Sequence, residues 1–390
     1  MAVNRHLSTV NYISYLSCTT SYPMQNELLH RIALTLVPHI GPVQARLLVD
    51  HFGDAASIFK AKRSALDKLD GIGTVRSGSI KQFDGMAEAE KELVFIDTYK
   101  INPLFLTDPQ YPRRLLNCYD PPTLLYYRGN TDLNAKRILA VVGTRYKTDY
   151  GKHLAEKLVA ELATHDTVVV SGLALGIDAI AHKTALKNGL PTVGVLAHGL
   201  DKIYPSEHKG LARDMLREQG GLLTEFRSKT SPDKHNFPTR NRIVAGMSDA
   251  AVVIETDIKG GSMITANLAF GYNREVFAFP GKTTDAKSAG CNYLIRSNKA
   301  MLVTSATDIA EAMGWEHQPA APKPVQQVLF TQLPDDEKRI VDLLKEKEVV
   351  HIDELNAATG LGTSMVAAAL LSLEMQNLVA SLPGKRYRLN

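Results

Sequence analysis

Six short apolar runs alternate with helical patterns between residues 138 and 279. The runs have the length of a β-strand, and segments between them, such as 152–163 and 177–187, repeat apolar residues with helical spacing. Continuous apolar strands that alternate with helices form a parallel sheet covered on both faces. The sequence therefore predicts an α/β fold, a Rossmann-like, doubly wound and mostly parallel sheet, with strands at 138–142, 167–170, 192–196, 221–225, 250–254 and 275–279.

Other patterns flank this core and divide the chain. Residues 1–24 have little helical pattern and are expected to be a loosely ordered extension, whereas 25–100 are expected to form a helical domain. Residues 101–313 hold the sheet and begin with a Pro-rich connection that ends in a strand. Proline and weak periodicity indicate a linker at 314–332, ahead of a winged helix at 333–390.

Two glycine-containing turns interrupt the helical pattern of the N-terminal part, at 37–42 and 69–73. The second matches the hairpin of a helix-hairpin-helix unit, whose backbone amides can meet phosphates. A small helical bundle with glycine turns explains the same pattern, and the sequence leaves both interpretations open.

The winged-helix pattern consists of helices near 335–346, 352–358 and 363–376, followed by a hairpin. A helix that reads duplex DNA normally carries basic or amide side chains toward the groove. The third helix has no Lys or Arg, and residues 331–390 carry 9 acidic against 7 basic side chains. We therefore expect this domain to serve protein contacts or self-association, although Lys385, Arg386 and Arg388 leave a weak DNA-backbone contact open.

Composition excludes several classes of protein. The three cysteines lie far apart and lack metal-ligand spacing, which argues against a disulfide framework or a zinc ribbon and fits a reducing cytoplasm. No apolar run reaches transmembrane length, and the N-terminus lacks the pattern of a signal peptide. Residues 135–312 carry 23 basic against 18 acidic side chains, which makes the middle of the chain the expected anion-binding region.

Glycine-bearing loops follow three of the predicted strands, at 143–145, 171–178 and 259–266. Glycine lets backbone N–H groups approach a ligand, and the loops open helices whose N-termini favour anions. Ligands of open α/β sheets bind beyond the carboxyl ends of the strands. A further segment, 237–246, adds two arginines, whose planar guanidinium groups suit phosphate. These loops predict a phosphate-binding site at one edge of the sheet.

The same loops do not match nucleotide-cofactor or catalytic motifs. The chain has neither a G-x-G-x-x-G after the first strand nor a G-x-x-x-x-G-K-[ST] motif, and no cofactor is expected. Asp178 and His182 lie four apart on one helix, where an acid/base or metal pair is conceivable but capping and packing are simpler. No hydrolytic or redox centre is evident, so the protein is not expected to be an enzyme.

Together these motifs resemble the DNA-processing protein A (DprA, also called Smf) family. The resemblance covers about residues 105–312 and is carried by Gly143-Thr144-Arg145, the segment 171–182, Gly199-Leu200-Asp201 with Tyr204-Pro205, Phe237-Pro238 with 240–243, Gly261-Ser262 with Thr265-Ala266, and Pro280-Gly281. Small departures occur at Ala197, His208 and Cys291. The N-terminal part is more weakly similar to the family's sterile-alpha-motif-like domain.

The resemblance implies a cytoplasmic, dimeric single-stranded DNA-binding protein of natural transformation that protects incoming strands and helps load the RecA recombinase. It implies phosphate contact by Arg145, a pocket lined by Gly143, Thr144, Ser171 and Gly172, flanking contacts from Phe237, Arg240, Asn241 and Arg242, and further contacts from Lys209, Lys259, Gly260, Gly261 and Ser262. The same resemblance suggests dimer contacts in 290–312, where Leu294, Ile295, Leu302 and Ile309 supply apolar surface or core.

Two alternatives remain open at the level of sequence. A nucleotide phosphoribohydrolase of related fold would share Gly260-Gly261, but Ala266-Asn267-Leu268 stand where such enzymes place an acid. Acid/base cleavage needs a positioned carboxylate, and Glu255 and Asp178 are the nearby candidates. The second alternative is an interaction scaffold that does not bind DNA.

Overall fold

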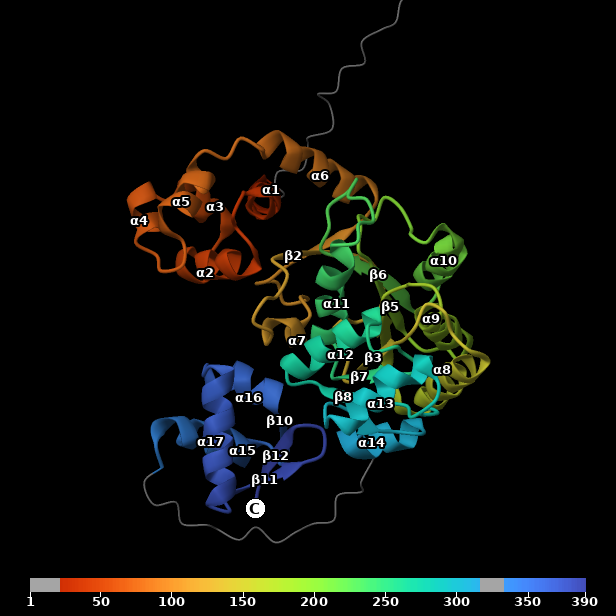
Figure 1. Ribbon diagram of the computed structural model, residues 1–390. Coiled ribbons are helices and arrows are strands. Elements are labelled where there is room, and N and C mark those ends of the chain that lie inside the picture. Colours follow the sequence, from red (N-terminus) through yellow and green to blue (C-terminus); the bar gives the residue numbers. More distant parts are fainter. Residues whose placement is uncertain (1–21, 316–332) are drawn as a thin grey trace, which may run out of the picture. The chain divides into compact units, whose positions relative to one another are not determined.

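The computed structural model describes residues 22–315 and 333–390 (Figure 1). The predicted N-terminal extension and the linker therefore lie almost entirely outside the described residues. The chain divides into two compact units, residues 1–95 and 96–390, and the boundary falls within helix α6 (Met86–Thr98). The second unit contains both the sheet and the winged helix.

The N-terminal unit is helical, as expected, and its two glycine turns are hairpins between helices. Arg76 ties the hairpins together, because its Nε donates to the carbonyl of His39 (3.2 Å) and its Nη1 to that of Gly71 (3.0 Å). Gly71 and Gly73 have φ of +85° and +63°, values that favour glycine. Besides α6 the helices are α1 (Tyr22–Leu36), α2 (Pro42–Phe52), α3 (Ala55–Lys60), α4 (Arg63–Asp67) and α5 (Gly73–Lys81).

The second unit is built on a nine-stranded sheet of order β1-β2-β6-β5-β4-β3-β7-β8-β9. β3 to β9 pair in parallel, and β2 is antiparallel to both β1 and β6. This confirms the predicted fold class, and each predicted strand is present within one or two residues. The strands are β1 (Asn102–Phe105), β2 (Leu124–Gly129), β3 (Ile138–Val142), β4 (Val168–Ser171), β5 (Thr192–Val195), β6 (Gly220–Thr224), β7 (Ala250–Val253), β8 (Glu275–Ala278) and β9 (Met301–Leu302).

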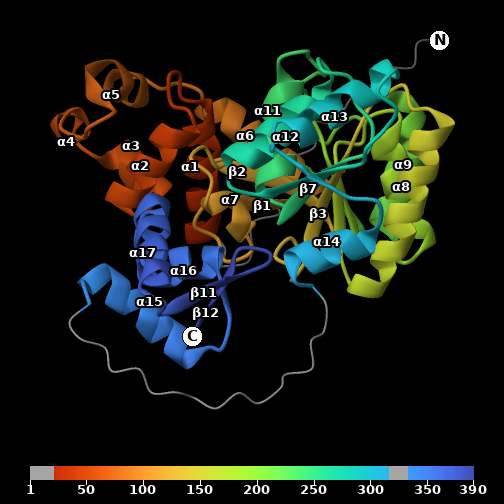
Figure 2. The same ribbon diagram turned by 60° about the horizontal axis from the view of Figure 1, so that its bottom comes forward.

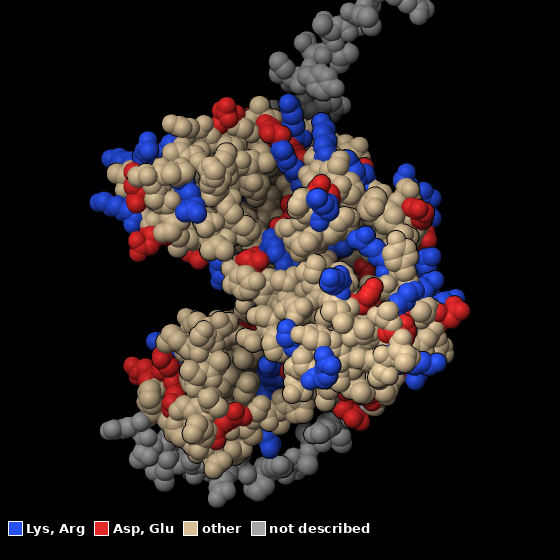
Figure 3. All heavy atoms as spheres, viewed as in Figure 1, with Lys and Arg blue, Asp and Glu red and all other residues tan. Residues whose placement is uncertain are grey.

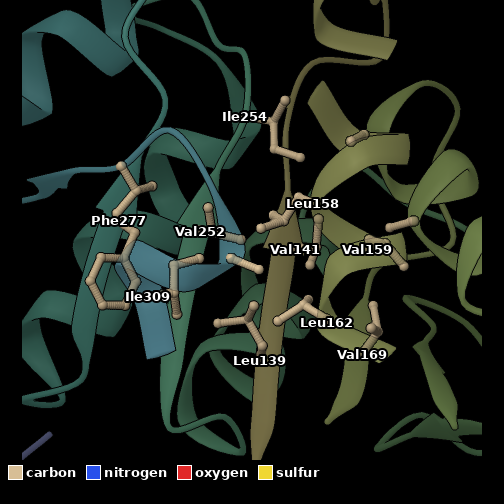
Figure 4. Packing of buried hydrophobic residues seen from close by; sticks show 14 of the residues in the cluster. Leu139, Val141, Leu158, Val159, Leu162, Val169, Val252, Ile254, Phe277 and Ile309 are labelled. Carbon is tan, nitrogen blue, oxygen red and sulfur yellow. The ribbon is translucent and has the colours of Figure 1, made fainter. Parts of the chain in front are cut away.

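Helices cover both faces of the sheet (Figure 2). Right-handed crossovers place the helices that follow β3, β4 and β5 on one face, and the chain then returns along the other face to β7. Apolar side chains of β3 and β7 pack with those of α8 and α14 in the core of Figure 4, where Val141, Leu158, Val252 and Ile309 are buried. The helices are α7 (Arg113–Leu116), α8 (Asp149–Glu161), α9 (Ile177–Lys187), α10 (Lys209–Arg217), α11 (Asn236–Gly246), α12 (Gly261–Gly271), α13 (Ala289–Arg296) and α14 (Ala306–Met313).

The last strand of this sheet, β9, is an edge strand with exposed apolar residues. Met301 is 55% and Leu302 47% exposed, and Tyr293 on α13 is 37% exposed. Leu294 and Ile309, which the sequence also offered as dimer-forming surface, are fully buried and belong to the core. Only part of the 290–312 segment is therefore available for contact with another chain.

The C-terminal part has the predicted winged-helix elements. Helix α17 turns Val366, Leu370 and Leu373 into the small core and exposes Met365 and Met375. The helix has no Lys or Arg, as the sequence indicated. The elements are α15 (Asp335–Glu346), β10 (Val350–His351), α16 (Ile352–Thr359), α17 (Thr363–Met375), β11 (Val379–Leu382) and β12 (Arg386–Leu389).

Within the described residues, no single helix is both long and apolar enough to cross a membrane. The pair α16 and α17 meets that criterion only when taken together, and the two helices are bent by 114° relative to each other.

Two largely buried ion pairs stabilise the amino-terminal edge of the sheet. Arg114 binds the Asp249 carboxylate through two nitrogens, at 2.6 and 2.9 Å, and Asp249 also accepts from the Ile138 backbone N–H at 2.8 Å. Arg274 donates to Asp353 of the winged helix at 2.6 Å. Asp249 therefore joins α7 to the starts of β3 and β7.

Replacing Asp249 should destabilise the protein strongly. Asp249→Ala leaves the Arg114 charge and the Ile138 N–H without their partner, and we expect the free energy of unfolding to fall by about 3 kcal/mol. Urea denaturation measures the change. The matched control is Lys152→Ala, which removes an exposed pair with Glu156 and should cost less than about 0.5 kcal/mol. Equal effects of the two substitutions would contradict the assignment.

Candidate functional site

The loops at the carboxyl edge of the sheet meet, as the sequence predicts, and hydrogen bonds tie them together. The Thr144 N–H after β3 donates to the carbonyl of Glu255 after β7 (2.6 Å), and the Thr144 carbonyl accepts from Ile177 N at the start of α9 (3.2 Å). Lys287 Nζ, beyond β8, donates to the Tyr146 carbonyl at 2.6 Å. The loops after β3, β4, β7 and β8 thus form one continuous edge.

Arg240 lies beneath this edge and is only 4% exposed. Its Nη1 donates to the carbonyls of Gly172, after β4, and Val195, in β5. Burial lowers the pKa of Arg240 to about 10, the Asp178 carboxylate opposes that shift, and the charge of Arg145 adds to it. Arg240 therefore braces two strand ends from α11 and lies close enough to Arg145 to add to the positive potential there.

Asp178 is committed to the turn after β4. Its Oδ2 accepts from the N–H groups of Gly172 (3.1 Å) and Ala174 (3.4 Å). Burial raises the pKa of Asp178, and Arg240 counteracts the shift. His182 is fully buried against the Thr192 hydroxyl, and burial lowers its pKa to about 3. The two side chains therefore act in capping and packing, the simpler of the two interpretations.

Three neighbouring side chains form what we call the edge cluster: the exposed Arg145 and Tyr204 and the partly buried Phe237. The Arg145 guanidinium carbon lies 5.0 Å from the centre of the Phe237 ring. The rings of Phe237 and Tyr204 are 6.1 Å apart, and Tyr204 is 48% exposed. A guanidinium suits a phosphate, and aromatic faces suit unpaired bases.

The loop after β7 supplies the other side of the edge. Lys259 is exposed, Gly260 caps α12 and Gly261 begins it. Asn241 connects this loop to Arg240, because its Nδ2 donates to the Gly261 carbonyl (3.3 Å) and its Oδ1 accepts from Arg240 Nε (3.0 Å). This arrangement holds the amides at the start of α12 in a fixed position.

Glu255, which follows β7 and is one of the two candidate carboxylates, is already engaged. It is 2% exposed and accepts from both the N–H (3.0 Å) and the hydroxyl (2.8 Å) of Thr148. Its role is to hold the loop that carries Arg145. Among the described residues, no group of three or more His, Cys, Asp or Glu side chains is placed to bind a metal ion.

Lys and Arg side chains border this region in the space-filling view, over α10 and α11, with acidic side chains between them (Figure 3). Lys209 is exposed at the start of α10, next to the buried His208, whose Nδ1 bonds with the Leu173 carbonyl at 2.8 Å. The positive charge at the edge is therefore spread over several loops.

Comparison with known proteins identifies the family. The family described as DNA recombination-mediator protein A matches residues 102–314, which include every strand of the large sheet, and the DprA winged helix domain matches 318–385. The chain belongs to the DprA family.

Individual DprA-family members agree with this assignment. Protein Smf of Synechocystis is 33% identical over 93% of this chain and 99% of its own length. The DNA processing protein DprA of Bacillus subtilis is 41% identical over 55% of this chain and 71% of its own. The crystal structure of DprA from Streptococcus pneumoniae has a TM-score of 0.61 and 34% identity, and the match covers 73% of this chain and 96% of that one.

Two of the side chains expected to meet a ligand in this DprA-family chain are buried and have other partners. Arg242 is 8% exposed, and its guanidinium is paired with the Glu225 carboxylate and the Asp120 carbonyl. Ser171 is fully buried and donates to the Val141 carbonyl (2.6 Å). Both side chains are part of the scaffold, which corrects the expectation that they meet a ligand.

Three further residues have structural rather than surface roles. Ser262 is 6% exposed and donates to Thr256 Oγ1 at 2.7 Å. Gly172 is held between Asp178 and Arg240. Gly143 abuts Ile177, and a side chain there would collide with it. By contrast, no sequence pattern predicts the Lys287–Tyr146 contact, because 141 positions separate the two residues.

The Arg242–Glu225 pair predicts a pH-dependent loss of stability. Burial raises the pKa of Glu225 and Arg242 opposes the shift, so Arg242→Ala should raise that pKa further. The folded state then binds a proton more tightly than the unfolded state does, and stability falls as pH rises. We expect Arg242→Ala to lose about 3 kcal/mol of unfolding free energy at neutral pH and less near pH 5.

Urea denaturation at both pH values measures this effect. The control is Arg242→Ala combined with Glu225→Gln, in which the pH dependence of the deficit should disappear. A deficit for Arg242→Ala that is the same at both pH values would show that Glu225 is not the group left unpaired.

Proposed function

We propose that this protein binds single-stranded DNA in natural transformation, protects incoming strands and helps to load the RecA recombinase onto them. The observation that carries the proposal is the edge cluster: exposed Arg145 lies against the Phe237 ring, that ring neighbours Tyr204, and the charge of Arg240 is close to Arg145. Membership of a family named for DNA recombination supports the same assignment.

The geometry favours a single strand over a duplex. Arg145, Lys259, Lys209 and the backbone amide of Gly261 at the start of α12 are suited to phosphates. The rings of Tyr204 and Phe237 offer faces on which unpaired bases stack, and stacking of this kind tolerates any base. Bases in a duplex are already stacked on one another. Asn241 and Arg240 contribute by fixing the loops rather than by direct contact.

The proposal includes no catalytic step. Cleavage of an N-glycosidic bond requires a carboxylate free to exchange a proton, and both Glu255 and Asp178 are buried and occupied by backbone and hydroxyl donors. Incubation with nucleoside monophosphates tests the phosphoribohydrolase alternative, since release of free base would establish it. Failure to retain oligothymidylate on a filter would instead favour the interaction scaffold.

We further propose a cytoplasmic homodimer that forms through the edge of the sheet. Within the part of the chain that the structure describes, β9 has no neighbouring strand on its outer side, and an exposed apolar edge strand is prone to pair with another chain. Tyr293, Met301 and Leu302 supply apolar surface there. Sedimentation equilibrium tests the assignment: the double variant Met301→Glu and Leu302→Glu should have half the mass of the wild-type assembly.

Removing the Arg145 charge should weaken binding to single strands of every sequence. Arg145→Ala loses a phosphate contact but no buried partner, so we expect affinity to fall about tenfold at low salt. The log–log salt slope should flatten by roughly 0.7, the contribution of one phosphate in a single strand. Fluorescence anisotropy with oligothymidylate over a salt series measures both quantities.

A lysine outside the site provides the control for this measurement. Lys183 on α9 is exposed and carries the same charge, and Lys183→Ala should leave both affinity and slope unchanged. If Arg145→Ala kept the wild-type slope, Arg145 would not be a phosphate contact and the site would have to lie elsewhere.

A further inference from the structure

The N-terminal unit has a basic groove of its own, separate from the carboxyl edge of the sheet. A hollow of about 560 Å³ lies among the end of α2, α3 and α4. We call it the basic groove, and its lining consists of Phe52, Ser57, Lys60, Ala61, Lys62, Ser64, Ala65 and Lys68. Three of its eight lining side chains are therefore lysines, and no acidic residue is among them.

The lysines of the groove are not used by the fold. Lys60, Lys62 and Lys68 are exposed, and none of their side chains forms a hydrogen bond or an ion pair in the described part of the chain. Lys81 of the same unit differs, because its Nζ donates to the Phe59 carbonyl at 2.6 Å. The charges of the groove therefore face solvent, free to meet an anion.

Two acidic residues near the groove, Asp54 and Asp67, are hydrogen-bonded within the fold. Asp54 caps α3, where its carboxylate accepts from the Ser57 N–H (2.7 Å) and hydroxyl (2.9 Å). The capping bonds, with a smaller contribution from Lys60, hold the pKa of Asp54 below its usual value. Asp67 on α4 accepts from the Ser77 hydroxyl. These carboxylates leave the lysine charges only partly compensated.

The apolar part of the groove's lining is small and contains one aromatic ring. Phe52 is half-buried at the end of α2, and Ala61 and Ala65 leave space beside it. An aromatic face among cations is the arrangement with which proteins hold single strands, since the base stacks on the ring while the phosphates meet the lysines. A duplex offers phosphates to such a groove but no free base.

We propose that the basic groove is a second contact site for single-stranded DNA. This inference rests on the proposed function. One part of a long strand is held at the edge cluster, and another part of the same strand contacts the groove. Two contacts on one strand raise the overall affinity through effective concentration. Long strands would then bind more tightly than the edge cluster alone allows.

The test compares short and long oligothymidylates on the full-length protein. The variant is Lys60→Gln, Lys62→Gln and Lys68→Gln together. The control, Lys91→Gln, Lys183→Gln and Lys187→Gln, changes the net charge equally through exposed lysines of α6 and α9. Thermal melting of both variants verifies folding. The strands are about 6 nucleotides, the size of a single binding site, and about 60 nucleotides.

We expect the groove variant to bind the short strand like the wild type and the long strand about tenfold more weakly, with a salt slope flatter by about 2. The control should match the wild type on both. Ultraviolet crosslinking of the long strand should also label the tryptic peptide 47–60, which contains Phe52.

Three results would overturn the proposal. If the groove variant and the control bind the long strand with equal affinity, the groove is not a DNA contact, and the proposal for the edge cluster is unaffected. Failure of the wild type to bind the short strand contradicts the proposed function itself, and the groove proposal with it. Equal weakening of a duplex and a single strand in the groove variant shows that the groove recognises phosphates alone, which contradicts the role of Phe52.

Discussion

The buried guanidinium of Arg240 is the contact on which the rest of the candidate site depends. It donates to the carbonyls of Gly172 and Val195 and binds the Asn241 amide, which in turn holds Gly261. One side chain on α11 thereby fixes the ends of β4 and β5 and the start of α12. A buried cation is costly unless it is paired and hydrogen-bonded, and Asp178 supplies the compensating charge. The same charge favours anions at the surface above it.

The remaining charges at the edge divide into two groups. Glu255, Asp178 and Arg242 are buried and have fixed partners, so their function is to hold loops. Arg145, Lys209 and Lys259 are exposed at the same edge. Because Glu255 and Asp178 are engaged from within, neither is available for acid/base chemistry, and the three exposed cations keep positive potential at the surface. That asymmetry favours holding a polyanion over transforming it.

Much of this architecture is predictable from local pattern, because buried parallel strands are apolar on both faces and their glycine loops open helices. The sequence pattern does not predict β9, because this strand has only two residues and both are exposed. It does not predict β1, because that strand contains Pro103 and lies at the edge of the sheet. The sequence pattern predicts one role for Arg240 and Arg242, although residues two apart on a helix diverge by about 200°. Because of that rotation, Arg240 contacts Gly172 and Arg242 contacts Glu225. Burial itself depends on distant partners that no local pattern reveals.

The most direct test of the central claim is to map which residues contact a bound single strand. Photocrosslinking of oligothymidylate to the full-length protein, read out by mass spectrometry, reports contact without presupposing an affinity. We predict crosslinks in the loop around Arg145 and in the segments that contain Tyr204 and Phe237, which lie together at the carboxyl edge of the sheet. Crosslinks confined to α17 of the winged helix, with none at the carboxyl edge, would contradict the account.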